Sequence, residues 1–321
     1  MIVEYVSQKI NAIRWRSTTD AMFRSAFEST FVCGTTDNCH KSDTNKVILG
    51  SVDSAIDDTV DISFKHELPI RGDVTRVITF NDILSLVTSN AGDARLYQIN
   101  ETGDKLSEIK VWYKLDEFGC MDAVHISPST AVICGKEGII KSVDVVKTDS
   151  DPQSSKVISQ TSLECIEQLS PNEVIVGNES GLLKVIDLRT SDSTMSLGYN
   201  LSIITCVKRN PSNRHIIASG NDSGVLSLWD LRSNASHLLH VAAHNALISE
   251  LQYKENDNNT IITSSNDGQL LKWTLTPSSQ FEKVDAIMGK EGDPAVNSFH
   301  INMNNDIIFS TDNEVLYFGQ M

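Results

Sequence analysis

The chain has 321 residues and carries 27 Lys and Arg against 42 Asp and Glu, which gives a formal net charge of −15. Because nucleic-acid binding draws most of its affinity from neutralised phosphates, this balance argues against direct binding of DNA or RNA. No window approaches the roughly 18 apolar residues of a membrane span, and the N-terminus lacks the features of a signal peptide. The six cysteines lie in or beside apolar runs, which is typical of reduced thiols in the cytosol or nucleus.

An apolar strand pattern recurs along the chain and sets its period. Apolar residues first occur at the characteristic spacing at Ile10, Ile13 and Trp15. The pattern begins again near residues 74, 121, 163, 204, 248 and 296. After a longer first unit the intervals are therefore roughly 40 to 48 residues, a period typical of repeat architectures. The long first interval predicts an insertion in the opening unit.

A second repeat runs in phase with the first, because each unit continues with a tight polar turn between two apolar strands. Asn, Asp and Gly dominate these turns, since they tolerate the positive φ that two-residue hairpin turns need. The turns contain Asp37, Gly92, Gly138, Gly181, Gly224, Gly268 and Asp312. Such a period, with four strand signals per unit, is typical of a β-propeller.

A fourth, outer strand follows in most units, at residues 61–68, 109–115, 156–161, 237–242 and 281–287. The seventh unit instead stops after its third strand, at residues 315–319. Residues 2–7 precede the first repeat and can supply the missing strand, which closes the ring and leaves no open blade. We therefore predict an all-β, seven-bladed β-propeller, closed by an N-terminal strand that completes the last blade, in one domain over residues 1–321.

The sixth unit resembles the WD-repeat family residue by residue. Two other units end in the WD-like sequences WDLR (229–232) and IDLR (186–189). In the sixth unit, His244 precedes the inner strand, Thr263 lies in the second strand, Asp267 in the turn and Trp273 in the third strand. The resemblance implies a WD40-type blade in which Asp267 accepts from His244, and His244 is linked through the Thr263 hydroxyl to the Trp273 indole. Most other units lack this tetrad.

The opening segment carries a closer resemblance. Its sequence YVSQKINAIRWR (5–16) is similar to the start of the WD-repeat nucleoporins of the forty-three-kilodalton type, which belong to the Y-shaped scaffold complex of the nuclear pore. Residues 210–232 of the fifth unit and residues 72–74 fit the same family. The resemblance implies a non-catalytic structural subunit that docks onto α-solenoid nucleoporins, notably the eighty-five-kilodalton one, beside another WD propeller. It also implies a nuclear location at the pore complex, no homo-oligomer, and roles in pore assembly, in nucleocytoplasmic transport of protein and mRNA, and at kinetochores in mitosis.

Motifs for metal binding and catalysis are weak in this sequence. His237, His240 and His244 have metal-like spacing, but strand geometry keeps such positions about 13 Å apart or on opposite faces. Cys33 with Cys39 and His40 resembles half of a zinc site without a second cysteine pair, so a core thiol and a loop thiol are favoured. No nucleophile elbow, Walker loop or dinucleotide fingerprint occurs. We expect no enzyme activity, no cofactor and no bound metal.

Candidate partner contacts come from one face and one outer strand. In WD propellers, the loops from outer to next inner strands and the turns from second to third strands share a face. We expect that face to carry His244 of the tetrad and the contact candidates Asp73, Asp116, Glu117, Asn245 and Asp293. Trp112 and Tyr113 are adjacent on a predicted outer strand, so one of them should point towards solvent or a partner and the other should pack inward.

Two other classes of function stay open at this point. A generic WD-repeat adaptor, such as a ubiquitin-ligase substrate receptor or a chromatin-complex subunit, would share the same fold. A propeller enzyme or metal-binding propeller would show carboxylates or histidines that converge in the central channel. A channel lined by apolar and hydroxyl residues would disfavour that class.

Overall fold

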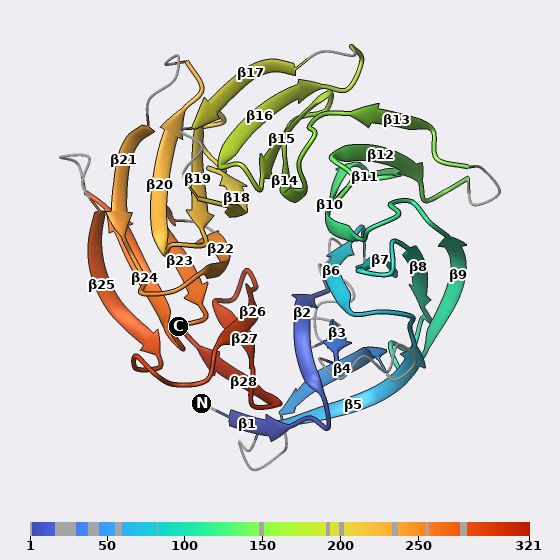
Figure 1. Cartoon of the computed structure of the whole chain (residues 1–321). Helices are drawn as coiled ribbons and strands as arrows, with labels where there is room; N and C mark the ends of the chain where they lie inside the picture. Colours follow the sequence, from blue (N-terminus) through green and yellow to red (C-terminus); the bar gives the residue numbers. More distant parts are fainter. Residues whose placement is uncertain are drawn as a thin grey trace.

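The computed structural model describes residues 2–16, 30–37, 45–54, 60–81, 83–147, 151–190, 193–198, 202–232, 237–254, 257–276 and 281–321. They form seven antiparallel sheets of four strands each, arranged as blades around a central axis (Figure 1). This is the predicted seven-bladed β-propeller. In the described part of the chain, no helix is long and apolar enough to cross a membrane.

The first four blades follow the chain from its first repeat, and each runs from the inner to the outer strand. Blade 1 contains β2 (Lys9–Trp15), β3 (Thr30–Thr36), β4 (Lys46–Ser54) and β5 (Val60–Pro69). Blade 2 contains β6 (Val74–Thr79), β7 (Leu84–Ser89), β8 (Ala94–Ile99) and β9 (Leu106–Trp112). Blade 3 contains β10 (Cys120–Ser127), β11 (Thr130–Gly135), β12 (Ile139–Asp144) and β13 (Ser154–Val157). Blade 4 contains β14 (Leu163–Ser170), β15 (Glu173–Asn178), β16 (Leu182–Asp187) and β17 (Ser193–Gly198).

The remaining blades complete the circle. Blade 5 contains β18 (Ile204–Arg209), β19 (Ile216–Asn221), β20 (Val225–Asp230) and β21 (His237–Ala242). Blade 6 contains β22 (Ile248–Lys254), β23 (Asp257–Ser265), β24 (Leu270–Leu275) and β25 (Phe281–Met288). Blade 7 contains β26 (Val296–Ile301), β27 (Asp306–Thr311), β28 (Val315–Gln320) and β1 (Ile2–Tyr5).

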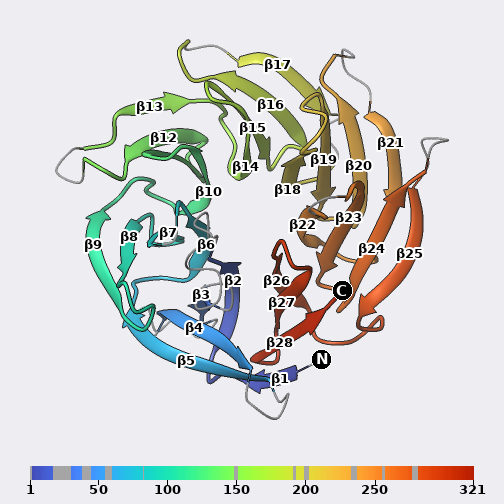
Figure 2. The same ribbon diagram turned by 180° about the vertical axis from the view of Figure 1, so that it is seen from behind.

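Blade 7 closes the ring with strands from both ends of the chain, as predicted. β1 pairs antiparallel with β28, with Ile2 opposite Phe318 and Tyr5 opposite Val315. The backbone N–H of Val6 then donates to the carbonyl of Glu314 at 2.8 Å. Figure 2, seen from behind, shows both chain ends beside this blade. Closure gives β28 a partner on both sides, so neither end of the repeat array is left as an open blade.

The inner strands begin close to the predicted positions, and the outer strands differ more. Inner strands start at residues 9, 74, 120, 163, 204, 248 and 296. The outer strand β17 of blade 4 is absent from the prediction. β9 ends at Trp112, three residues before the predicted end, because Lys114 adopts a positive φ of 52° and turns the chain. β13 begins and ends earlier than predicted.

Adjacent blades pack closely because small residues end several second strands. A Cβ atom added at Gly34 would lie 2.2 Å from Val74 at the start of the next inner strand, and one at Gly177 would lie 2.5 Å from Ile204. Buried apolar clusters run between neighbouring blades in the same way. Trp15, at 2% exposure, packs edge-on against Phe31 of its own blade and Phe318 of blade 7. It is the inter-blade core residue that the sequence predicts.

Candidate functional site

The inner strands all begin at one face of the propeller, which we call the upper face. In blade 2, the register pairs the start of β6 with the end of β7, and the start of β8 with both the end of β7 and the end of β9. The loops between blades and the turns between second and third strands therefore share this face. They are joined there by backbone bonds, for example from Leu115 N–H to Gly92 carbonyl and from Ala243 N–H to Gly224 carbonyl.

The four residues of the tetrad in blade 6 form one chain of hydrogen bonds below the upper face. Nδ1 of His244 lies 3.0 Å from the Asp267 carboxylate, and Nε2 lies 2.8 Å from the hydroxyl of Thr263. The indole N–H of Trp273 donates to the same hydroxyl at 3.0 Å. All four side chains are buried. The tetrad therefore links four parts of blade 6: the loop before β22, strand β23, the turn between β23 and β24, and strand β24.

Removal of the shared hydroxyl tests the contribution of this tetrad. We expect Thr263→Val to lower the free energy of unfolding by about 1–3 kcal/mol, because the His244 nitrogen and the Trp273 N–H stay buried without their shared partner. Urea denaturation monitored by tryptophan fluorescence measures the change. The control is Thr190→Val at an exposed site, which should stay within about 0.5 kcal/mol of the parent. Equal stability of the two variants would contradict a stabilising role for the tetrad.

Blade 5 keeps only half of the set. The indole N–H of Trp229 donates to Ser219 at 2.8 Å, the counterpart of the Trp273 contact with Thr263. At the end of β16, Arg189 forms a bidentate ion pair with Asp187. At the end of β20, Arg232 forms the same kind of pair with Asp230. These arginine contacts hold the pKa of both aspartates near 2. The WD-like endings thus form local ion pairs on the opposite, lower face.

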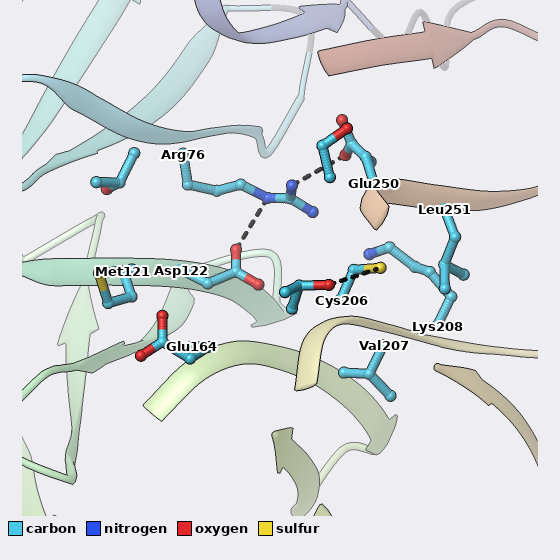
Figure 3. Close-up of a pocket in the computed structure, with 12 residues that line it drawn as sticks. Arg76, Met121, Asp122, Glu164, Cys206, Val207, Lys208, Glu250 and Leu251 are labelled. Carbon is cyan, nitrogen blue, oxygen red and sulfur yellow. Dashed lines mark hydrogen bonds and ion pairs between the residues drawn. The ribbon is translucent and has the colours of Figure 1, made fainter. Parts of the chain in front are cut away.

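The central channel contains a charged cluster that joins strands far apart in the sequence. Glu250 on β22 contacts Arg14 on β2, and its Oε1 lies 2.9 Å from Nη1 of Arg76 on β6. Ser298 on β26 donates to the other carboxylate oxygen at 2.8 Å. Arg76 also reaches Asp122 on β10, with Nε 2.9 Å from the carboxylate (Figure 3). We call Arg14, Arg76, Asp122 and Glu250 the channel brace.

Within the brace, Glu250 and Arg76 keep their charges at neutral pH. Burial alone would raise the pKa of Glu250, but Arg14, Arg76 and the hydrogen bond from Ser298 outweigh it and lower that pKa to about 2. For Arg76, burial lowers the pKa, yet Asp122 and Glu250 raise it above its ordinary value. These carboxylates are therefore paired with guanidinium groups, and they are not placed as a proton-sharing pair. Mutual pairing is what makes such burial of charge tolerable.

Because the pKa values of His300 and Glu250 are lowered in the folded state, we expect the protein to lose stability in mild acid. Burial, followed by the nearby Arg14 charge, lowers the pKa of His300 to about 3, so the folded protein keeps this imidazole neutral. The unfolded chain binds a proton below about 6.5, and stability therefore falls as the pH decreases from about 6.5. Glu250 adds a further loss below about 4.5, where only the unfolded carboxylate takes up a proton.

Denaturant unfolding at pH 7, 6 and 5 separates the effect of His300 on stability from that of Glu250. The effect of Glu250 appears only below about pH 4.5. We expect the protein to lose stability between pH 7 and pH 5, and His300→Gln to lose less over the same interval. Gln keeps an acceptor for the backbone N–H of Trp15, whose nitrogen lies 3.2 Å from His300 Nδ1. Identical pH profiles would show that His300 does not carry the acid sensitivity.

A cavity of about 90 Å³ lies in the channel beside the brace. Most of its lining comes from the second and third residues of five inner strands, so it lies towards the upper face. The lining includes Thr75, Met121, Glu164, Thr205 and Ser249, with Arg76, Asp122 and Glu250 one residue further along their strands. Lys208 also lines it and pairs with Glu167 at 2.7 Å. This volume accommodates about three water molecules or one small polar head group.

The structure divides the predicted contact residues into exposed and buried ones. Glu117, Asn245 and Asp293 are exposed on the upper face, and Tyr113 is 66% exposed. Asp73 is half-buried and accepts hydrogen bonds from Asn45 and Asn90.

Trp112 and Asp116 are corrections to the predicted contact surface. Trp112 is 4% exposed and packs in the core shared by blades 2 and 3, so Tyr113 is the outward member of the aromatic pair. Asp116 is 3% exposed because its carboxylate caps the backbone N–H groups of Phe118, Gly119 and Glu137.

The metal-like motifs do not assemble in the described residues. No group of three or more His, Cys, Asp or Glu side chains suited to a metal ion occurs among them. His244 is held by the tetrad, while the side chain of His237 and all of Cys39 and His40 lie outside the described residues. Cys33 is buried, and burial raises the pKa of its thiol far above the usual range.

The channel brace is the feature that the sequence did not predict. A signal existed, because Arg76, Asp122, Glu250 and Ser298 all lie two residues after the apolar residue that starts an inner strand. This position, two residues after the start of the inner strand, therefore carries a charged residue in three of the seven units. Nothing in the spacing, however, says which blades face each other across the channel.

The fold and the hydrogen-bonded tetrad define a class: a seven-bladed propeller that fits a WD-repeat protein. In comparisons with known proteins, no family model matches the chain and no curated protein matches it significantly.

Proposed function

We propose that this chain is a non-catalytic docking subunit of the nuclear pore's Y-shaped scaffold, which binds an α-solenoid nucleoporin through one face of its propeller. The observation that carries the proposal is the opening segment 5–16, whose sequence is similar to the start of the forty-three-kilodalton type of WD-repeat nucleoporin. In the structure this segment supplies β2, with Trp15 between blades 1 and 7 and Arg14 in the channel brace. The similar residues thus build the junction that closes the ring.

The chemistry of the channel supports a docking role over catalysis. The channel does contain converging carboxylates, the feature expected of a propeller enzyme. Three of them, Asp122, Glu167 and Glu250, are each paired with an arginine or lysine. For Glu250 the pairing lowers the pKa to about 2, far from the pKa near neutrality that general acid or base catalysis needs. A rigid, braced ring is instead suited to present several surface loops at fixed positions.

Affinity purification tests the proposal directly. The tagged chain is isolated from nuclear extract, the bound proteins are identified by mass spectrometry, and the purification is repeated from the nucleoporin side. We expect the α-solenoid nucleoporins of the Y complex to co-purify in both directions. Recovery of ubiquitin-ligase or chromatin subunits without nucleoporins would overturn the pore assignment and favour a WD-repeat adaptor. A fluorescent fusion should further mark the nuclear rim.

A further inference from the structure

The rim of the channel at the upper face carries a ring of inter-blade hydrogen bonds. In four blades, the residue after the first apolar residue of the inner strand carries a polar side chain, which donates to the carbonyl of the first apolar residue of the next inner strand. The four such contacts are Asn11 to Val74 (2.7 Å), Thr205 to Ile248 (2.6 Å), Ser249 to Val296 (2.6 Å) and Asn297 to Ile10 (3.3 Å). Each bond fastens one blade to its neighbour.

The ring is interrupted at blades 2 to 4. Thr75 occupies the same position in blade 2, but its hydroxyl pairs with Thr88 of its own blade at 2.8 Å. Met121 and Glu164 occupy the position in blades 3 and 4. Neither a thioether nor a carboxylate can donate to a carbonyl. In blades 3 and 4, the thiols of Cys134 and Cys165 lie 4.0 and 3.6 Å from the carbonyls of Leu163 and Ile204 instead, so weak sulfur donors replace the polar side chains and the rim presents acceptor groups there.

Glu164 has no partner for its charge among the described residues. It is half-buried at the rim of the channel cavity, and Figure 3 shows it beside Met121 with no contact to the other side chains drawn. The other charges of the cavity are compensated: Arg76 by Asp122 and Glu250, and Lys208 by Glu167. Within the described part of the chain, Glu164 is thus the charge without a counter-charge in a cavity large enough for a small head group.

Two exposed aromatic residues lie in the upper-face loop that joins blade 2 to blade 3. The loop before β10 carries Tyr113 at 66% and Phe118 at 65% exposure, and Met121 follows Phe118 by three residues. Asp116 holds this loop by accepting the N–H groups of Phe118 and Gly119 at 3.0 and 2.9 Å. Rigid exposed aromatic side chains are typical anchors of protein interfaces, because little entropy is lost when they are covered.

We infer that the upper face at blades 2 to 4 is the docking surface, and that it takes a partner segment in which an arginine or lysine follows or precedes an apolar residue. The basic side chain enters the channel cavity and pairs with Glu164, while the apolar residue covers Phe118, which lies two residues before the inner strand β10. The net charge of −15 favours such a basic segment over an acidic one. This inference rests on the proposed docking function, for which it names the face and the chemistry of the partner.

The cavity is tested first with a small probe that does not depend on any partner. The full chain is labelled with ¹³C at the methionine methyl groups and titrated with Nα-acetyl-arginine amide, with the neutral isostere Nα-acetyl-citrulline amide as control. We expect a saturable shift of the Met121 methyl resonance with the arginine probe, at least about fivefold weaker with citrulline, and lost in Glu164→Gln. An equal response to both probes, or a response retained in Glu164→Gln, overturns the inference.

The second arm measures the dissociation constant for the α-solenoid nucleoporin of the Y complex by calorimetry. We expect Glu164→Gln to weaken binding about tenfold, as for other interfacial charge pairs. Glu101→Gln, an equal charge change at an exposed site in the β8–β9 loop of the lower face, should change it less than twofold. Normal binding by Glu164→Gln overturns the inference and leaves the proposed function standing. A cavity that takes the arginine probe in a chain that binds no nucleoporin overturns the proposed function and keeps the site.

Discussion

Replacement of Glu250 by Gln is expected to destabilise the propeller by about 3–5 kcal/mol. The substitution keeps the shape of the side chain and removes the carboxylate that Arg14 and Arg76 share. Arg76 retains Asp122, but Arg14, which is 7% exposed, loses the carboxylate with which it pairs. An uncompensated buried charge is costly because the protein interior solvates it poorly. Equilibrium urea unfolding measures the loss.

Two further variants separate the buried pair from a general effect of charge. Glu282→Gln removes the same charge at an exposed site on the outer strand β25 and should stay within about 0.5 kcal/mol of the parent. Arg14→Met combined with Glu250→Gln should lose less than the sum of the two single changes, because the unpaired guanidinium is then gone. Additive losses, or a Glu250→Gln variant as stable as the Glu282→Gln control, would show that the brace does not stabilise the ring.

Deletion of residues 1–5 is expected to cost about 3–4 kcal/mol, on the basis of about 1 kcal/mol for each backbone hydrogen bond lost with β1. The deletion also uncovers Phe318, which packs against Trp15 in the cluster that β1 helps to cover. β28 then becomes an open edge strand, so we expect the shortened chain to self-associate. Thermal denaturation and size-exclusion chromatography give the two readouts.

The control for this deletion keeps the strand and changes its most exposed side chain. Tyr5 is 77% exposed, so Tyr5→Ser should leave the melting temperature and the monomeric elution volume nearly unchanged. A shortened chain that remained monomeric and as stable as the parent would mean that blade 7 does not need β1 for closure.

The sequence by itself determined the number of blades, the inner-strand starts and the closing strand. These features are local: each blade is a set of hairpins, and apolar alternation with turn residues such as Gly92 and Gly268 marks every hairpin within a few residues. The four tetrad residues were found for the same reason, because they occur at set places within one unit. The outer strand β17 escaped prediction because outer strands are exposed and their apolar pattern is weak.

Only the tertiary structure decided what lies in the channel. Arg14 and Glu250 are separated by 236 residues, and they meet because the inner strands of blades 1 and 6 lie close enough across the channel. A register shift near the start of each of these strands sets which residue points inward. The burial of Trp112 and Asp116 was decided in the same way, by packing of the end of β9 and of the loop that follows it against the neighbouring blade. The repeat period gives the number of blades, whereas closure of the propeller determines which of their side chains come into contact.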